Sequence, residues 1–156
     1  MGRPATPPRL LFTYWVAASA AGLAEPSDGP RLLVYLTATT AGGTDRIGAQ
    51  CGLVDALDRL GHTPCVETVE AMFDSTVYSY LRERCAVTTS RLSPAFARER
   101  AIECLDDCES GTRLVGITHA DLSIREVRER LGRIAEDPTE DDDNRQAARN
   151  RIFLDH

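Results

Sequence analysis

The chain has 156 residues, enough for one domain built around one hydrophobic core. Hydrophobic residues make up 42% of it and charged residues 27%, as in ordinary globular domains. The formal net charge is −6, and all 18 basic residues are arginines. Because a protein that binds phosphate backbones needs a basic surface, this acidic balance argues against nucleic acid as a partner.

The cysteine pattern does not indicate disulfides or a metal site. An odd number of cysteines at irregular spacing is not typical of a disulfide framework. Cys104 and Cys108 would share one face of a helix, but no CxxC pair or neighbouring histidine completes a zinc site, so no metal is expected. We expect all the cysteines to be small buried apolar residues. They are Cys51, Cys65, Cys85, Cys104 and Cys108.

Residues 1–29 form an N-terminal extension with two interpretations. Arginines precede the apolar run Leu10–Ala21, and small residues follow as far as Ala24, which is the order of a secretory signal peptide. The run is too short for a transmembrane helix, which needs about 20 apolar residues. Alternatively, Leu10–Val16 is an additional β-strand, because it is rich in aromatic and β-branched residues. The cysteine pattern favours the cytoplasm over secretion.

The first half of the remaining chain has the pattern of a β-α-β unit. Leu32–Ala38 is almost continuously apolar, as in a strand buried on both faces. A helix follows from a cap at Asp45 to Gly61, with Ile47, Cys51, Val54 and Leu57 on its buried face. Pro64–Val69 is the second strand, parallel to the first through a right-handed crossover.

The second half repeats this alternation. The first helix should have Val77, Tyr80 and Leu81 facing inward, and Ser93-Pro94 should open the second. The expected elements in chain order are a helix over Met72–Arg84, a strand over Cys85–Thr89, a helix from Ser93 to Gly111, a strand over Arg113–Thr118, a helix over Ile124–Ile134 and a short helix over Asn144–Arg151.

This order predicts an α/β fold, with a doubly wound short parallel sheet over residues 30–136 and an acidic C-terminal segment over residues 137–156. A helical adaptor domain is the alternative, and it requires that Leu32–Ala38 and Arg113–Thr118 are not strands. In doubly wound folds, ligands bind beyond the carboxyl ends of the strands. The loops that would meet there include residues 39–44 and Ser90.

Two features at that edge could carry chemistry. The loop between the first strand and its helix has free backbone N–H groups that can meet a phosphate or ribose, although a flexible turn is the plainer interpretation. The Glu103 carboxylate could bond a ribose diol or stabilise an oxocarbenium-like centre, although its spacing alone favours a solvated helix-face glutamate. His62 and His119 are expected to be surface or loop histidines. The candidate ligand-binding residues are Thr39, Gly42, Gly43, Thr44 and Ser90.

The stretch from Leu32 to Ile117 resembles TIR domains and, more loosely, nucleoside deoxyribosyltransferases. The resemblance rests on a first strand followed by a helix that ends in Leu-Gly-His62, on the strand and turn of Ala86–Pro94, and on Glu103 followed by Gly111–Ile117. It implies a flavodoxin-like three-layer architecture. In catalytic TIR domains a glutamate on the corresponding helix contacts the ribose of NAD, whose nicotinamide N-glycosidic bond is cleaved, so the resemblance implies Glu103 as the catalytic residue.

Three functions therefore stay open at this point. The first is a TIR-like enzyme that binds a small nucleotide and cleaves NAD as its substrate, with no other cofactor. The second is a non-catalytic TIR-like module that signals by association, including assembly into a homo-oligomer. The third is a small secreted binding protein, which requires cleavage after Ala24.

Overall fold

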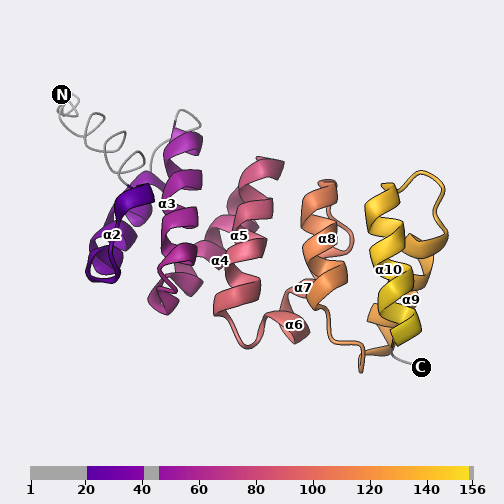
Figure 1. The fold of residues 1–156 in the computed structure, drawn as a ribbon. Helices are drawn as coiled ribbons and strands as arrows, with labels where there is room; N and C mark the ends of the chain where they lie inside the picture. The colour runs from indigo at the N-terminus through magenta and orange to yellow at the C-terminus, as the bar shows by residue number, and fades with distance from the viewer. Residues whose placement is uncertain (1–20, 41–45, 155–156) are drawn as a thin grey trace.

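The computed structural model describes residues 21–40 and 46–154, and every regular element in these ranges is a helix (Figure 1). The α/β prediction with its doubly wound, flavodoxin-like sheet is therefore wrong, because the described ranges contain no β-strand. The helical alternative had required that Leu32–Ala38 and Arg113–Thr118 are not strands, and both runs lie inside helices.

The helices follow one another as hairpins with short connections. In the described ranges they are α2 (Gly29–Thr40), α3 (Ile47–Arg59), α4 (Val66–Ser75), α5 (Ser79–Leu92), α6 (Phe96–Glu99), α7 (Ala101–Cys104), α8 (Ser110–His119), α9 (Arg125–Glu136) and α10 (Asp142–Leu154). The structure also describes the 3₁₀ helices η1 (Ala21–Leu23), η2 (Pro26–Asp28) and η4 (Thr63–Cys65).

The hairpins are stacked side by side in two layers (Figure 1). One layer is the row α3, α5, α8 and α10, in which each helix packs against the next. In the other layer, α2 packs on α3, α4 on α5, α7 on α8 and α9 on α10. Each repeat unit thus contacts mainly its neighbours, which is the construction principle of α-solenoids.

In the runs that were predicted to be strands but form helices, threonine hydroxyl groups donate hydrogen bonds to backbone carbonyls of the same helix. Thr37 in α2 donates to the Leu33 carbonyl at 3.0 Å, and Thr118 in α8 donates to the Leu114 carbonyl at 2.8 Å. Thr89 in α5 likewise donates to the Cys85 carbonyl at 2.8 Å, where the third strand was expected. Threonine is tolerated in helices when its hydroxyl bonds back in this way, and burial of the apolar face overrides the weak local preference for strand.

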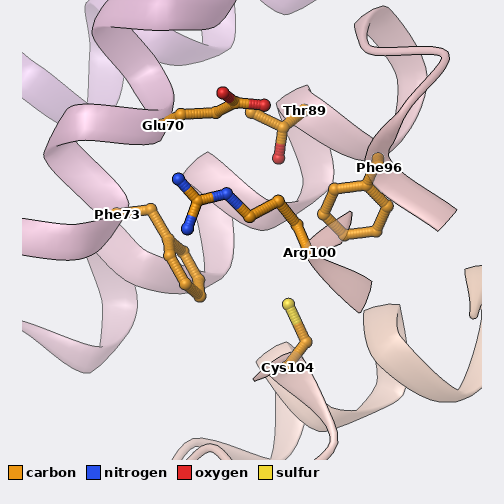
Figure 2. A pocket seen from close by; sticks show the side chains of 6 residues that line it. All are labelled: Glu70, Phe73, Thr89, Phe96, Arg100 and Cys104. Atoms are coloured by element: carbon orange, nitrogen blue, oxygen red, sulfur yellow. The ribbon is translucent and has the colours of Figure 1, made fainter. Parts of the chain in front are cut away.

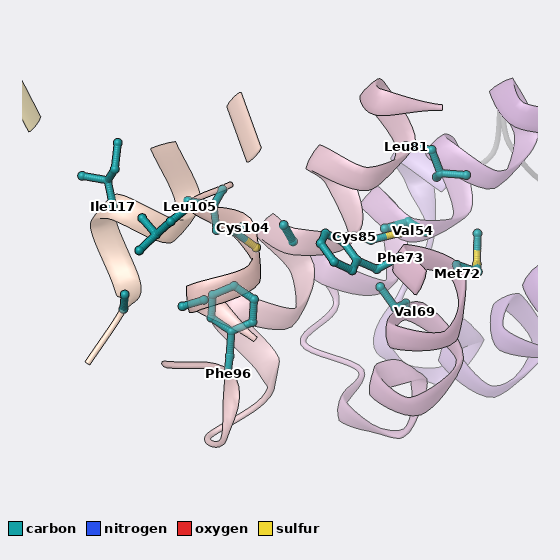
Figure 3. Packing of buried hydrophobic residues seen from close by; sticks show 14 of the residues in the cluster. Val54, Val69, Met72, Phe73, Leu81, Cys85, Phe96, Cys104, Leu105 and Ile117 are labelled. Carbon is teal, nitrogen blue, oxygen red and sulfur yellow. The ribbon is translucent and has the colours of Figure 1, made fainter. Parts of the chain in front are cut away.

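The core runs through all the hairpins rather than between a sheet and helices. Figure 3 shows it continuing from Val54 and Phe73 to Cys104 and Ile117. The inward residues predicted for α3 are confirmed at Cys51, Val54 and Leu57, which are buried, whereas Ile47 is only partly buried. The predicted burial of all five cysteines is wrong at one position: four are buried, and Cys108 is exposed.

Arginine–carboxylate pairs join successive hairpins. Arg91 of α5 contacts Asp58 of α3 at 2.6 Å. Arg100, between α6 and α7, donates to both carboxylate oxygens of Asp74 in α4 at 2.9 and 3.0 Å. Such bidentate pairs fix orientation as well as distance. Among the described helices, none is long and apolar enough to cross a membrane.

Candidate interaction surface

Of the predicted ligand-binding residues, the structure describes Thr39 and Ser90, which lie in different helices, α2 and α5. Thr39 is buried in α2, and its hydroxyl donates to the Leu36 carbonyl at 2.6 Å. Ser90 lies in α5, where its hydroxyl donates to the Val87 carbonyl at 2.8 Å. Both hydroxyls are therefore used within their own helices. Gly42, Gly43 and Thr44 lie outside the described residues.

Glu103 lies in α7 and has the geometry of a surface glutamate. Its side chain is half exposed and accepts a hydrogen bond from Arg100 at 3.1 Å. Arg100 is at the same time bound to Asp74, so this carboxylate belongs to an ion-pair network that joins α4 and α7. The catalytic role of Glu103 stays a prediction, and the sheet edge that motivated it is absent from the described ranges.

A small hollow is lined in part by Arg100 and Cys104, which flank Glu103 in the sequence. Figure 2 shows its lining, and its volume is about 190 Å³, including space open to solvent. Ligand pockets usually measure about 300–1,000 Å³, so this hollow cannot enclose a dinucleotide. Burial raises the pKa of the Cys104 thiol to about 12, which leaves it protonated and unreactive. The lining residues are Glu70, Phe73, Thr89, Phe96, Arg100 and Cys104.

His119 also has a structural environment. Its ring meets the Phe96 ring edge-on, with centroids 6.2 Å apart. Partial burial and the nearby charges of Arg151 and Arg91 lower the pKa of His119, so its neutral form is favoured. This arrangement is typical of a packed imidazole in an aromatic contact.

The α4–α5 turn, in contrast, presents a cluster of apolar and aromatic side chains to solvent. Seven large hydrophobic residues are exposed among those the structure describes, and three of them fall within residues 77–80. Val77 is 88% exposed, Tyr78 39% and Tyr80 54%. We call Val77, Tyr78, Tyr80 and the adjoining guanidinium of Arg84 the tyrosine patch. The prediction that Val77 and Tyr80 face inward is wrong.

A break between two helices exposes this cluster. The sequence predicted one helix over Met72–Arg84, whereas α4 ends at Ser75 and Thr76 adopts extended backbone. The Tyr78 N–H donates to the Thr76 hydroxyl oxygen at 3.2 Å, and the Tyr78 carbonyl accepts from the N–H groups of Leu81 and Arg82 in the first turn of α5. The poor helix formers of residues 75–79 are the signal that could have located the break.

Within the patch, Tyr80 is held in place by neighbouring side chains. The Arg84 guanidinium carbon lies 4.5 Å from the Tyr80 ring centroid, and Arg84 also donates to the Tyr80 hydroxyl. The same guanidinium donates to the Asp55 carboxylate on α3, and this bond is the main reason that the pKa of Arg84 is raised. The aromatic ring is thus ordered before any partner arrives.

No family model, curated protein or solved structure matches the chain. No cluster of metal-binding side chains occurs in the part of the chain that the structure describes.

Proposed function

We propose that this chain is a non-catalytic interaction module, a stack of helical hairpins that binds another protein through the tyrosine patch. The observation that carries the proposal is the concentration of exposed apolar and aromatic side chains at residues 77–80. Stacked-hairpin proteins commonly use their extended surfaces for binding.

The chemistry of the patch fits a protein interface. Tyrosine and arginine are enriched among the residues that dominate binding energy, because they combine large apolar area with polar ends. Tyr80 is already ordered by Arg84 and Asp55, so less side-chain entropy is lost on binding. Val77 adds an aliphatic contact that has no role in the core, since it is 88% exposed.

Catalysis has less support among the described residues. The hollow beside Arg100 is too small for NAD, and Glu103 is engaged by Arg100. Cleavage of NAD therefore stays an untested prediction that no feature of this geometry favours. A second copy of this chain is one partner that the patch could bind, and an oligomer would then result.

The proposal is tested by placing a photoreactive benzoyl-phenylalanine at Tyr78 in the full chain and irradiating it in its native cells. We expect a discrete crosslinked product that Tyr80→Ala strongly reduces, while the same probe at Glu129, an exposed position on α9, gives none. A product of twice the chain mass would identify the partner as a second copy. Unfolding of Tyr80→Ala must match wild type, because the side chain is exposed.

Two results would contradict the proposal. One is crosslinking that is equally strong with and without the Tyr80 ring, because the patch would then not be the binding surface. The other is nicotinamide release from NAD by the purified chain that Glu103→Gln abolishes, which would restore the enzymatic hypothesis.

A further inference from the structure

The helix α2 is apolar on two sides, but the described residues cover only one of them. Leu32, Leu36 and Thr39 are buried against the rest of the stack, whereas Val34, on another side of the helix, is 66% exposed. We call the exposed side the outer face of α2. It lines a groove of about 810 Å³, including space open to solvent, together with residues of the α3–α4 connection. Apart from one histidine, no lining residue has an acidic or basic side chain. The lining residues are Pro30, Leu33, Val34, Thr37, Ala38, His62 and Pro64.

The position of this face in the stack makes its exposure unusual. The terminal units of a stacked-hairpin array need polar outer faces, and a helix that is apolar all round is normally buried. At the opposite end of the stack, the described residues of α9 and α10 expose one large hydrophobic side chain, Phe153, among many charged and polar ones. The charged and polar ones include Arg125, Glu126, Arg128, Glu129, Arg133, Gln146, Arg149 and Asn150.

At one end of the groove, the His62 side chain packs tightly against Gly29 of α2. Gly61 has a φ of +61°, and the turn that it forms leads directly to His62. The His62 ring lies so close to α2 that a Cβ on Gly29 would be 2.4 Å from Nδ1. Nε2 of His62 is buried and has no hydrogen-bond partner among the described residues. An occupant that supplied a hydroxyl group would remove the cost of that unpaired atom.

We propose that residues Leu10–Val16 of this chain cover the outer face of α2. The segment (LLFTYWV) carries no charge, which matches the lining of the groove, and it contains the hydroxyls of Thr13 and Tyr14. The inference does not depend on the tyrosine patch, which lies on the α4–α5 turn.

Chain connectivity favours this segment over a second copy. The structure describes the chain from Ala21 onward, and Ala21 follows Val16 by five residues, which span at most about 17 Å when extended. The segment itself has seven residues and is about 23 Å long when extended, enough to run along α2, whose 12 residues measure about 18 Å. The chain before α2 is also anchored beside the first hairpin, because Arg59 donates to the Ala24 carbonyl at 3.3 Å. A tether this short gives an effective concentration of about millimolar, which a second copy reaches only at very high protein concentration.

The only tryptophan of the chain, Trp15, reports directly on this contact. In the full-length protein we expect blue-shifted Trp15 emission and protection from acrylamide quenching. Val34→Asp should abolish both, giving the emission and quenching of the urea-unfolded chain, because a carboxylate in an apolar contact is strongly disfavoured. Val77→Asp is the matched control: it is equally a surface valine but lies outside the groove, and it should change neither signal.

Circular dichroism establishes that Val34→Asp is folded, and Ala38→Asp, on the same face, replaces it if it is not. The proposal is overturned if Trp15 of the native protein is as accessible as in urea, or if its protection survives both aspartate variants. It is also overturned if protection appears only as protein concentration rises, which would identify a second copy as the occupant. A natural chain whose mass shows that it begins at Glu25 would equally overturn it, because Trp15 would have been removed.

Discussion

Replacing Gly116 by alanine tests the closest helix–helix contact in the stack. A Cβ at Gly116 in α8 would lie 2.8 Å from the Ala101 carbonyl oxygen and 2.9 Å from the Leu105 nitrogen. Real Cβ atoms are essentially never found this close to another heavy atom, and both of these neighbours are backbone atoms that no side-chain rotation can move. The backbone of α7 would therefore have to shift away from α8.

Two opposing effects set the change in the free energy of unfolding that Gly116→Ala causes. Alanine is favoured over glycine in a helix interior by about 1 kcal/mol. Overpacking a closely packed core costs about 1–3 kcal/mol. Because the α7–α8 contact involves main chain on one side, we place the cost in the upper part of that range and expect a net destabilisation of about 1 kcal/mol.

Gly132→Ala is the matched control, because Gly132 lies in α9 and a Cβ there would meet no described atom within 4 Å. It should stabilise the protein by about 1 kcal/mol through helix propensity alone. Urea unfolding followed by far-UV circular dichroism measures both variants, which should shift the midpoint in opposite directions at unchanged slope. If Gly116→Ala were as stabilising as Gly132→Ala, the close packing of α8 on α7 would be refuted.

Two further predictions concern titratable groups. In the native protein, the thiol reagent DTNB should react rapidly only with Cys108, because the other four cysteines are buried. Burial also raises the pKa of Cys65 to about 11 and of Cys85 to about 12, which keeps these thiols protonated. Cys108→Ser should remove the rapid phase, and rapid labelling of that variant would contradict the structure. Burial tends to raise the pKa of Glu140, but hydrogen bonds from Arg113 at 2.6 and 2.7 Å outweigh it and lower that pKa below its usual 4.5. The unfolded chain then binds the proton more readily, so this stabilisation is complete above pH 4.5 and is lost as the pH falls through the lowered pKa. Glu140→Gln should lower the free energy of unfolding by about 2 kcal/mol at neutral pH and make it less dependent on pH in acid. An unchanged pH dependence in that variant would show that the pair with Arg113 is not formed.

Part of the fold was predictable from local pattern alone. The helices α3 and α9 were predicted because their apolar residues recur every three to four positions, and the structure buries Val54 and Leu57 in one and Val127 and Leu131 in the other. The end of α3 was marked by Gly61, whose positive φ is the conformation that glycine adopts most readily. In each case the signal lies within the element itself.

The tyrosine patch was not predictable in this way. Its exposure depends on the break between α4 and α5, and residues 72–84 read as one helix because Met72, Leu81 and their neighbours keep a helical spacing. The three non-helical residues between α4 and α5 interrupt the helical repeat, so a different set of side chains turns inward after the break. Tyr80 therefore faces solvent although its residue type and spacing favoured the core, and only the three-dimensional structure reveals the Arg84 contact that orders it.

The wrong prediction of a strand at Leu32–Ala38, which lies in α2, has a different cause. It bears on the inference about the N-terminal segment. Short apolar runs such as Leu32–Ala38 do not distinguish a doubly covered strand from a doubly covered helix, so the element type was wrong. The lack of charged residues in this run still favours burial on two sides, because that preference comes from the transfer of apolar surface out of water and not from backbone conformation. The described stack supplies one cover for α2, namely α3. The apolar, uncharged run at Leu10–Val16 is the segment of this chain whose composition and tether allow it to be the other.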